Sequence, residues 1–221
     1  MMMMTTTILN PQLFAAYLLA ACIVIAAPGP DSMNTLAIGM SRGRREAMAY
    51  ACGVGIGCLT HTLWAVLGIS AIVAASETLF AIVKWVGVAY LLWLGGQALR
   101  ERRALPVADD RAHSVQANNS AATRVLQGAL TNALNPKVML FFMAFLPQFA
   151  DPRLGMIGAQ MLLMGLTFAA ITAVAYVLLG AGAGSMGERL MRQPSIARWL
   201  NRVTGVLFIA LAVRLMLAER R

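Results

Sequence analysis

The stretch IAAPGPDSMNTLAIG, residues 25–39, interrupts an apolar run with two prolines, a glycine and an aspartate. The run LFAAYLLAACIVIAA leads into this break, and a second helical stretch follows it. Proline removes a backbone hydrogen-bond donor and clashes with the carbonyl group four residues back. The meaning of the break therefore depends on whether water or lipid surrounds the chain.

The composition indicates lipid. Of the 221 residues, 59% are hydrophobic and 12% are charged, and the mean hydropathy is +0.70, whereas soluble domains carry about 25% charged residues. Residues 47–74 and 154–183 are runs of 28 and 30 residues without a formal charge, and a helix needs about 20 apolar residues to cross a bilayer. We therefore expect an all-α integral membrane protein, whose N-terminus lacks the basic region of a cleavable signal peptide.

Six membrane spans are predicted, near residues 13–40, 47–74, 79–99, 124–149, 154–183 and 199–217. The first is broken at residues 28–30 and the fourth near residues 135–136. The connections SRGRRE, 100–123 and GERLMRQPSIAR are rich in arginine, whereas ASET and QFADPRLG carry one arginine between them. Basic loops stay in the cytoplasm, so both termini are expected outside. This placement also explains the net charge of +9 without a nucleic-acid partner.

The two halves of the chain resemble each other. Residues 100–123 form a polar linker between three-span halves at 13–99 and 124–217, and the breaks PGPD and NPKV fall in the first span of each half. KWVGVAYLLWL and NRVTGVLFIAL place Gly87 on Gly205 and Tyr90 on Phe208. Because three is an odd number of spans, the second half enters from the opposite side. Inverted repeats with interrupted helices at equivalent places are typical of transporters, and we expect two inverted three-helix repeats.

Each break places a charged residue directly after a proline, Asp31 after Pro30 and Lys137 after Pro136. Counted from Arg42 and Arg124, which are interpreted as marking the cytoplasmic edge, these charges lie roughly 16 and 20 Å deep at 1.5 Å per residue, near the middle of a ~30 Å hydrocarbon core. An isolated charge is costly there, so we expect the two side chains to pair in the empty protein. The half-helix ends also expose carbonyl and N–H groups, which together suit a small zwitterion.

Further polar residues lie near these breaks. Asn34 follows Asp31 by about one turn, and Asn132 precedes Asn135 by three residues, so each pair shares a helix face. These asparagines are candidates for substrate binding, with helix-to-helix hydrogen bonding as the alternative. His61 is a candidate proton relay, with a hydrogen bond to a neighbouring helix as the alternative. The residues that make the helix breaks are Pro28, Gly29, Pro30 and Pro136.

The ordered set of motifs resembles the LysE/RhtB family of bacterial amino-acid exporters. The likeness runs from about Phe14 to Leu217 and is strongest at APGP (27–30), SRGRREAMAYACGVGIG (41–57), KWVGVAYLLWLGGQALR (84–100) and GALTNALNPKVMLFFMAFLPQF (128–149). The resemblance implies an inner-membrane permease that expels amino acids or close derivatives, driven by the proton-motive force. The NPK form at 135–137 is more similar to the homoserine/threonine branch. Asp31 stands where many relatives carry asparagine.

These inferences define the expected function. We expect a non-enzymatic efflux transporter for a small amino acid or derivative, threonine-like or homoserine-like, that works by proton antiport in the bacterial inner membrane with both termini periplasmic. Asp31 would hold the ammonium group or carry the coupled proton, and Lys137 would hold the carboxylate. The partners are the substrate, protons and the lipid bilayer; a homodimer is left open, and no cofactor or metal is expected. The alternatives are a divalent metal-ion exporter and an uncoupled channel.

Overall fold

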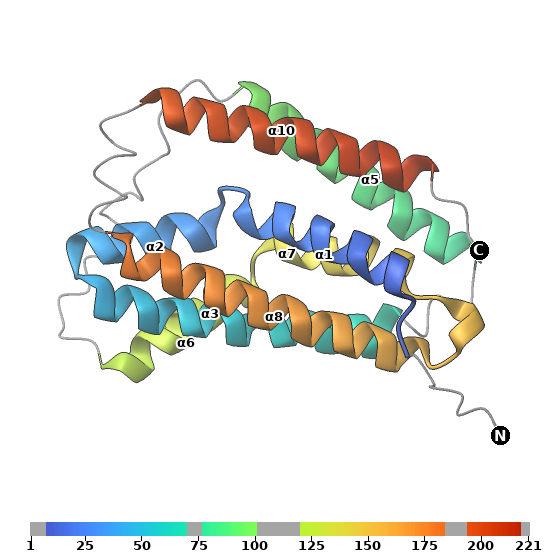
Figure 1. Ribbon diagram of the computed structural model, residues 1–221, viewed down its shortest axis with the longest axis horizontal. Coiled ribbons are helices and arrows are strands. Elements are labelled where there is room, and N and C mark those ends of the chain that lie inside the picture. The colour runs from blue at the N-terminus through green and yellow to red at the C-terminus, as the bar shows by residue number, and fades with distance from the viewer. Residues whose placement is uncertain (1–7, 70–76, 101–119, 184–193, 218–221) are drawn as a thin grey trace.

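The computed structural model describes residues 8–69, 77–100, 120–183 and 194–217, which contain helices and no strands. The first break separates α1 from α2, and the second separates α6 from α7 (Figure 1). Short 3₁₀ turns and one π-helical turn extend some of the helices. The elements are α1 (Pro11–Ala26), α2 (Pro30–Ser41), α3 (Arg44–Trp64), η1 (Ala65–Ile69), α5 (Glu77–Arg100), α6 (Ala121–Ala133), α7 (Pro136–Ala144), η3 (Leu146–Phe149), η4 (Pro152–Leu154), α8 (Ile157–Ala181) and α10 (Pro194–Leu217).

The helix lengths confirm a multi-pass membrane architecture with two broken spans. Arg44–Gly68, Ile157–Ala181 and Arg198–Leu217 are each long and apolar enough to cross a membrane. The pair Pro11–Ala26 and Pro30–Arg42 bends by 48°, and the pair Ala121–Ala133 and Pro136–Phe149 bends by 52°. Helix α5 has 24 residues, or roughly 36 Å at 1.5 Å per residue. The chain is therefore an all-α membrane protein with about six spans.

Two pairs of corresponding helices, α3 with α8 and α5 with α10, lie beside each other and run in opposite directions (Figure 1). In the pair α3–α8, Gly165 contacts Thr62 and Gly180 contacts Ala47. The end of α3 therefore packs against the first half of α8, and the start of α3 packs against the end of α8, so the two helices are antiparallel. In the pair α5–α10, Gly95 likewise meets Gly205. Such antiparallel pairing is the arrangement that inverted three-helix repeats would produce. Helix α1 begins and α10 ends at the same end of the molecule.

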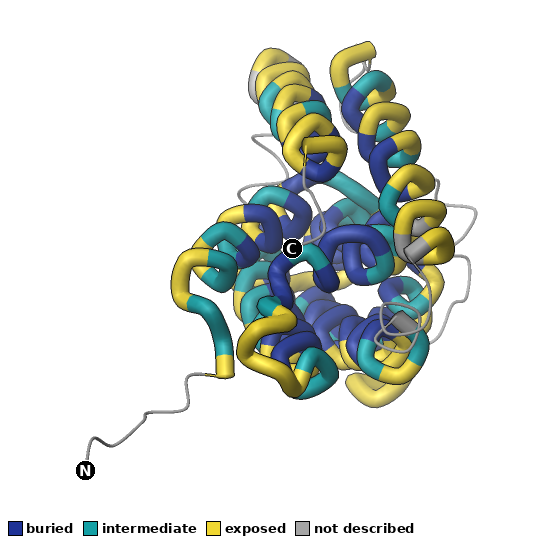
Figure 2. The backbone as a smooth tube through the Cα atoms, turned by 90° about the vertical axis from the view of Figure 1, so that its right-hand side faces the viewer, coloured by how far each residue is buried: buried dark blue, intermediate teal, exposed yellow. Residues whose placement is uncertain are grey.

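Glycines bring the backbones of α3 and α6 into direct contact. A Cβ atom added at Gly53 would overlap the carbonyl oxygen of Val125, and one at Gly128 would overlap that of Tyr50. Small residues allow this close approach between membrane helices. The two helices run parallel and form one tightly packed unit, whereas α5 and α10 form a pair at the edge of the molecule with exposed residues outward (Figure 2).

Some boundaries differ from those expected. The fifth span was expected to start at residue 154, but α8 starts at Ile157, because Gly155 (φ 65°) and Met156 (φ 48°) turn the chain out of a helical path. The end of the second expected span, 70–74, lies outside the described residues. Most of the expected linker, 101–119, lies outside them too, and its last residues belong to α6.

Candidate functional site

The first break exposes backbone carbonyl groups at the end of α1. Pro28 and Pro30 carry no N–H group, and the N–H of Gly29 donates to Ser32 Oγ at 3.0 Å. The last carbonyls of α1 therefore have no partner within their own helix. Groups from elsewhere in the molecule must satisfy them, because lipid offers none.

Two side chains from the second half of the chain satisfy these carbonyls. The hydroxyl of Tyr176, on α8, donates to the carbonyl oxygen of Ile25 at 3.0 Å. The ammonium of Lys137, on α7, donates to the carbonyl oxygen of Ala27 at 2.8 Å. The first break is thus completed by the opposite half of the protein, and both hydrogen bonds are buried.

At the second break, Asn135 caps the following helix and a side chain of the first half of the chain satisfies a backbone carbonyl. The side chain of Asn135 caps α7 by accepting from the N–H of Lys137 at 3.0 Å. On α3, Nε2 of the buried His61 donates to the carbonyl oxygen of Asn132, near the end of α6, at 2.8 Å. This is the helix-to-helix bond that the sequence left as the alternative to a proton relay. A relay role for His61 stays a prediction.

Asp31 is the point where the two breaks meet. Its Oδ2 accepts from Asn132 Nδ2 at 2.8 Å and from Asn135 Nδ2 at 2.7 Å. The side chains of all three residues are buried, with Asp31 1% exposed. Within the part of the chain that the structure describes, Asp31 Oδ1 and Asn132 Oδ1 are buried acceptors with no hydrogen-bond partner. A buried acceptor in that condition is costly, so this pair of oxygens is suited to a ligand that donates hydrogen bonds.

The expected ion pair between Asp31 and Lys137 is wrong for this conformation. An ion pair within 4.0 Å joins Glu46 and Arg124, whereas Asp31 and Lys137 form none. Lys137 lies instead against Gly29, where an added Cβ would be 2.9 Å from Nζ, and donates to the carbonyl freed by the break. The two amides satisfy one oxygen of Asp31. Each charged side chain therefore hydrogen-bonds to groups at the breaks and not to the other charged side chain.

The other predicted residues take supporting positions. Asn34 is half-buried and donates to the hydroxyl of Tyr50, on α3, at 3.2 Å, so it does not join the Asp31 cluster. Pro30 and Pro136 each stand at the first position of a helix, where a missing N–H costs nothing. Pro28 and Gly29 are half-buried in the turn between α1 and α2. No group of three His, Cys, Asp or Glu residues that could hold a metal ion occurs among the described residues.

Aromatic side chains fill the bundle on the α7 side of the cluster. Phe141 stacks on Tyr17 and Phe145 and lies 5.3 Å from Phe168, centroid to centroid. Phe142 packs against both Phe168 and the ring of His61. This packing separates the polar cluster from the end of the molecule at which α1 begins.

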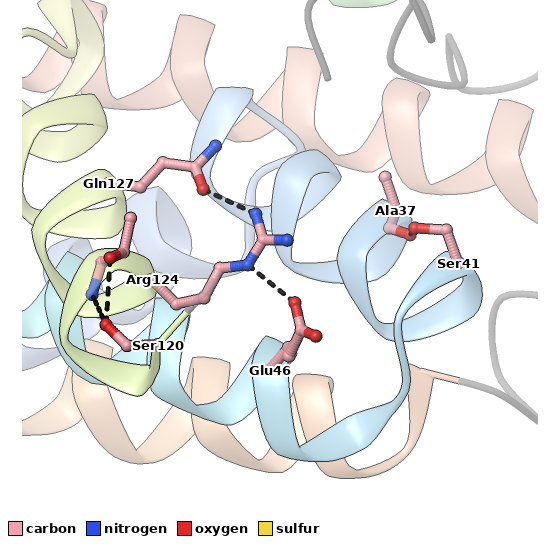
Figure 3. A network of polar contacts seen from close by, with 7 residues as sticks. Ala37, Ser41, Glu46, Ser120, Arg124 and Gln127 are labelled. Carbon is pink, nitrogen blue, oxygen red and sulfur yellow. Dashed lines mark hydrogen bonds and ion pairs between the residues drawn. The ribbon is translucent and has the colours of Figure 1, made fainter. Parts of the chain in front are cut away.

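Two features of the site were not predicted from the sequence. Tyr176 is one aromatic residue in a long apolar span, so nothing in the sequence distinguishes it from a packing residue. Arg124 was interpreted as a marker of the cytoplasmic edge, yet its side chain is 7% exposed and its Nε lies 2.7 Å from Glu46 Oε2 (Figure 3). The signal available was the placement of Glu46 as the one acid in the basic segment SRGRRE.

The fold and this cluster describe a membrane protein with a polar, charged centre built from two helix breaks, as expected of a secondary transporter. The sequence comparison is more specific. Residues 22–219 match the family described as LysE type translocator, and the chain belongs to that family.

Several relatives match along nearly the whole chain. A protein of Vibrio cholerae named "Uncharacterized membrane protein" is 34% identical over 94% of this chain and 98% of its own length. The "Leucine efflux protein" of Klebsiella pneumoniae is 30% identical over 91% of this chain and 93% of its own length. The "Homoserine/homoserine lactone efflux protein" of Salmonella typhimurium is 29% identical, covering 92% and 96%. No solved structure matches the chain.

Proposed function

We propose that this translocator exports a small amino acid or amino-acid derivative across the bacterial inner membrane in exchange for protons. The family membership and the two efflux relatives named for leucine and for homoserine support the substrate class. The polar cluster lies within the two broken spans. Transport rather than catalysis is the function that such an arrangement serves.

The observation that carries the proposal is the pair of unpartnered oxygens, Asp31 Oδ1 and Asn132 Oδ1. An ammonium group has three N–H donors and a positive charge, so it is suited to an unpartnered carboxylate oxygen such as Asp31 Oδ1. A proton on Asp31 would neutralise the same carboxylate when no ammonium is bound. Asp31 therefore binds the substrate ammonium and carries the coupled proton at different stages of the cycle, with His61 as a further candidate for proton transfer.

Lys137 is assigned to the substrate carboxylate. Its ammonium donates to the carbonyl oxygen of Ala27, and this neutral acceptor can be exchanged for a carboxylate, which forms a stronger charge-assisted bond. Asn132 and Asn135 hold Asp31 in place and select the ligand by hydrogen bonding. Asn34 contributes from α2 once its bond to Tyr50 is released.

The orientation follows from the basic loops. We assign the connections at 41–46, 100–123 and 187–198 to the cytoplasm and both termini to the periplasm, because arginine-rich loops are retained inside. Two inverted repeats, 13–99 and 124–217, then present their breaks to the same level of the membrane. The antiparallel pairing of α3 with α8 supports this division.

The test is efflux from cells and proton flux in vesicles. Cells that overproduce the protein are grown on a panel of toxic amino acids and analogues, and the compounds released are measured. Export of an amino acid with substrate-dependent proton uptake into vesicles supports antiport. Substrate movement without proton flux would favour an uncoupled channel, and release of a divalent metal ion alone would favour the metal-exporter alternative.

A further inference from the structure

A second charged cluster lies at the cytoplasmic end of the molecule, apart from the Asp31 site. Arg124, near the start of α6, donates from Nε to Glu46 Oε2 at 2.7 Å and from Nη1 to Gln127 Oε1 at 2.9 Å (Figure 3). Its third nitrogen, Nη2, makes no hydrogen bond to any described residue. The guanidinium is thus buried and charged, and only two of its three nitrogens donate hydrogen bonds to described residues.

Glu46 holds Arg124 by one bond. An arginine and a carboxylate pair best through two parallel N–H···O bonds, yet only Oε2 of Glu46 is engaged, through Nε. The side chain of Glu46 is 27% exposed, against 7% for Arg124. The carboxylate can therefore leave towards water while the guanidinium stays in place between α3 and α6.

The pair does not open by separation of its helices. Gly53 and Gly128 hold the backbones of α3 and α6 in contact directly beyond the pair, so the two helices move as one unit. Breaking the Arg124–Glu46 bond then requires exchange of the carboxylate rather than movement of a helix. A second carboxylate is the natural replacement.

The surroundings favour an anionic group that comes from the cytoplasm. Arg42, at the end of α2, and Arg44 and Arg45, at the start of α3, are exposed and close to Glu46 in the chain. Clustered positive charge of this kind raises the local concentration of anionic groups. Along α6, the polar residues Gln127, Thr131 and Asn132 then lead from Arg124 to Asp31.

We propose that Arg124, Gln127 and Glu46 form a mouth site that takes the carboxylate of the outgoing amino acid before it reaches Asp31. This proposal rests on the proposed export function. Arg124 and Asn132 are eight residues apart on α6, or about 12 Å along the helix. The ammonium and carboxylate of one α-amino acid are too close together to reach both sites. The substrate therefore occupies the two sites in succession, and Glu46 is the resident carboxylate that it displaces.

The test measures initial transport rates on the cytoplasmic face, using inverted membrane vesicles. The probes are homoserine, which has a carboxylate, and homoserine lactone, which has none; leucine and leucinamide provide a second pair. Arg124→Gln should raise the half-saturating concentration of homoserine about tenfold, the effect of one lost charged hydrogen bond, and change that of the lactone by less than about twofold. Glu46→Gln should lower the value for homoserine, because it removes the competing carboxylate.

Opposite results would overturn the mouth site. If Glu46→Gln impairs homoserine transport as much as Arg124→Gln, or if Arg124→Gln affects acid and lactone equally, the pair is structural. Arg124→Gln leaves Glu46 unpaired. If it folds poorly for that reason, the double variant Arg124→Gln/Glu46→Gln must still raise the half-saturating concentration of homoserine relative to that of the lactone. An effect of Arg124 that vanishes in liposomes of phosphatidylcholine alone would assign the guanidinium to anionic lipid headgroups.

The outcome separates this proposal from the export function itself. Wild-type vesicles that transport neither homoserine nor leucine would overturn the proposed function and the mouth site together. Wild-type transport that does not depend on Arg124 would overturn the mouth site alone.

Discussion

The two helix breaks share a geometry but differ in chemistry. Both bend a membrane span by about the same angle, 48° and 52°, and both restart the helix at a proline. The break between α1 and α2 supplies acceptors, namely the carboxylate of Asp31 and the freed carbonyls of Ile25 and Ala27. The break between α6 and α7 supplies donors, namely the amides of Asn132 and Asn135 and the ammonium of Lys137.

This difference explains why neither half can make the site alone. Each break leaves backbone groups that lipid cannot satisfy, and in each case a side chain of the other half satisfies them. An acceptor break facing a donor break also gives the centre a direction, with one end suited to an ammonium group and the other to a carboxylate. A zwitterionic amino acid matches that polarity.

The largest expected effect comes from the acceptor break. Asp31→Asn keeps the shape of the side chain and removes its charge, so the substrate ammonium and the coupled proton lose their partner. A buried hydrogen bond to a charged group is worth about 1.5–3 kcal/mol, and efflux should fall by about a hundredfold. The measurement is initial efflux per folded protein, and near-normal export would remove Asp31 from the site.

The donor break should give a smaller but clear loss. Lys137→Met removes the ammonium that holds the Ala27 carbonyl and, in our proposal, the substrate carboxylate; efflux should fall by about tenfold. Lys84→Met is the matched control, because Lys84 also donates to a backbone carbonyl, that of Met216, at the edge of the molecule. Efflux that falls equally in both variants would indicate a general loss of structure.

The double variant Asp31→Asn/Lys137→Met sharpens the same comparison. Because each side chain is held by groups of the breaks and not by the other side chain, the double variant should be less stable than either single variant. A double variant that is more stable than either single variant would indicate that Asp31 and Lys137 do form the ion pair expected from the sequence. Thermal unfolding in detergent provides the measurement.

Tyr176→Phe tests the repair of the first break by α8. It leaves the carbonyl of Ile25 without its donor and should cost about 1 kcal/mol of stability, with efflux reduced by less than about threefold. Tyr17→Phe is the control, since the Tyr17 hydroxyl also donates to a backbone carbonyl, that of Met164, within a continuous helix. Tyr176→Phe should lose more activity than Tyr17→Phe. A larger loss in Tyr17→Phe would mean that the freed carbonyl of Ile25 does not need the Tyr176 hydroxyl for transport.

Deletion of residues 107–118 should have the smallest effect on folding. This segment has a polar, mixed-charge composition that does not support a packed core, so membrane yield should be unchanged and efflux lowered by less than about tenfold. Loss of folded protein would show that the segment contributes contacts to the helices. Yield is measured by size-exclusion chromatography of the solubilised protein.

The sequence predicted the architecture well because long uncharged runs and intramembrane prolines are local signals. The break positions, the approximate span limits and the proximity of Asp31, Asn132 and Asn135 follow from them. The partner of Lys137 could not be predicted, since it depends on which freed carbonyl the side chain reaches in three dimensions. The same holds for Tyr176 and for Glu46, whose partners lie 151 and 78 residues away.

The most direct test of the account measures whether Asp31 recognises the substrate ammonium. Binding to the purified protein is compared for an amino acid that the wild type exports, homoserine or leucine, and for the same molecule without its amino group, 4-hydroxybutanoate or 4-methylpentanoate. Removing the amino group should weaken binding to the wild type by at least about tenfold and should make little further difference in Asp31→Asn. If Asp31→Asn still prefers the amino acid by the wild-type margin, the ammonium is bound elsewhere and the central claim is contradicted.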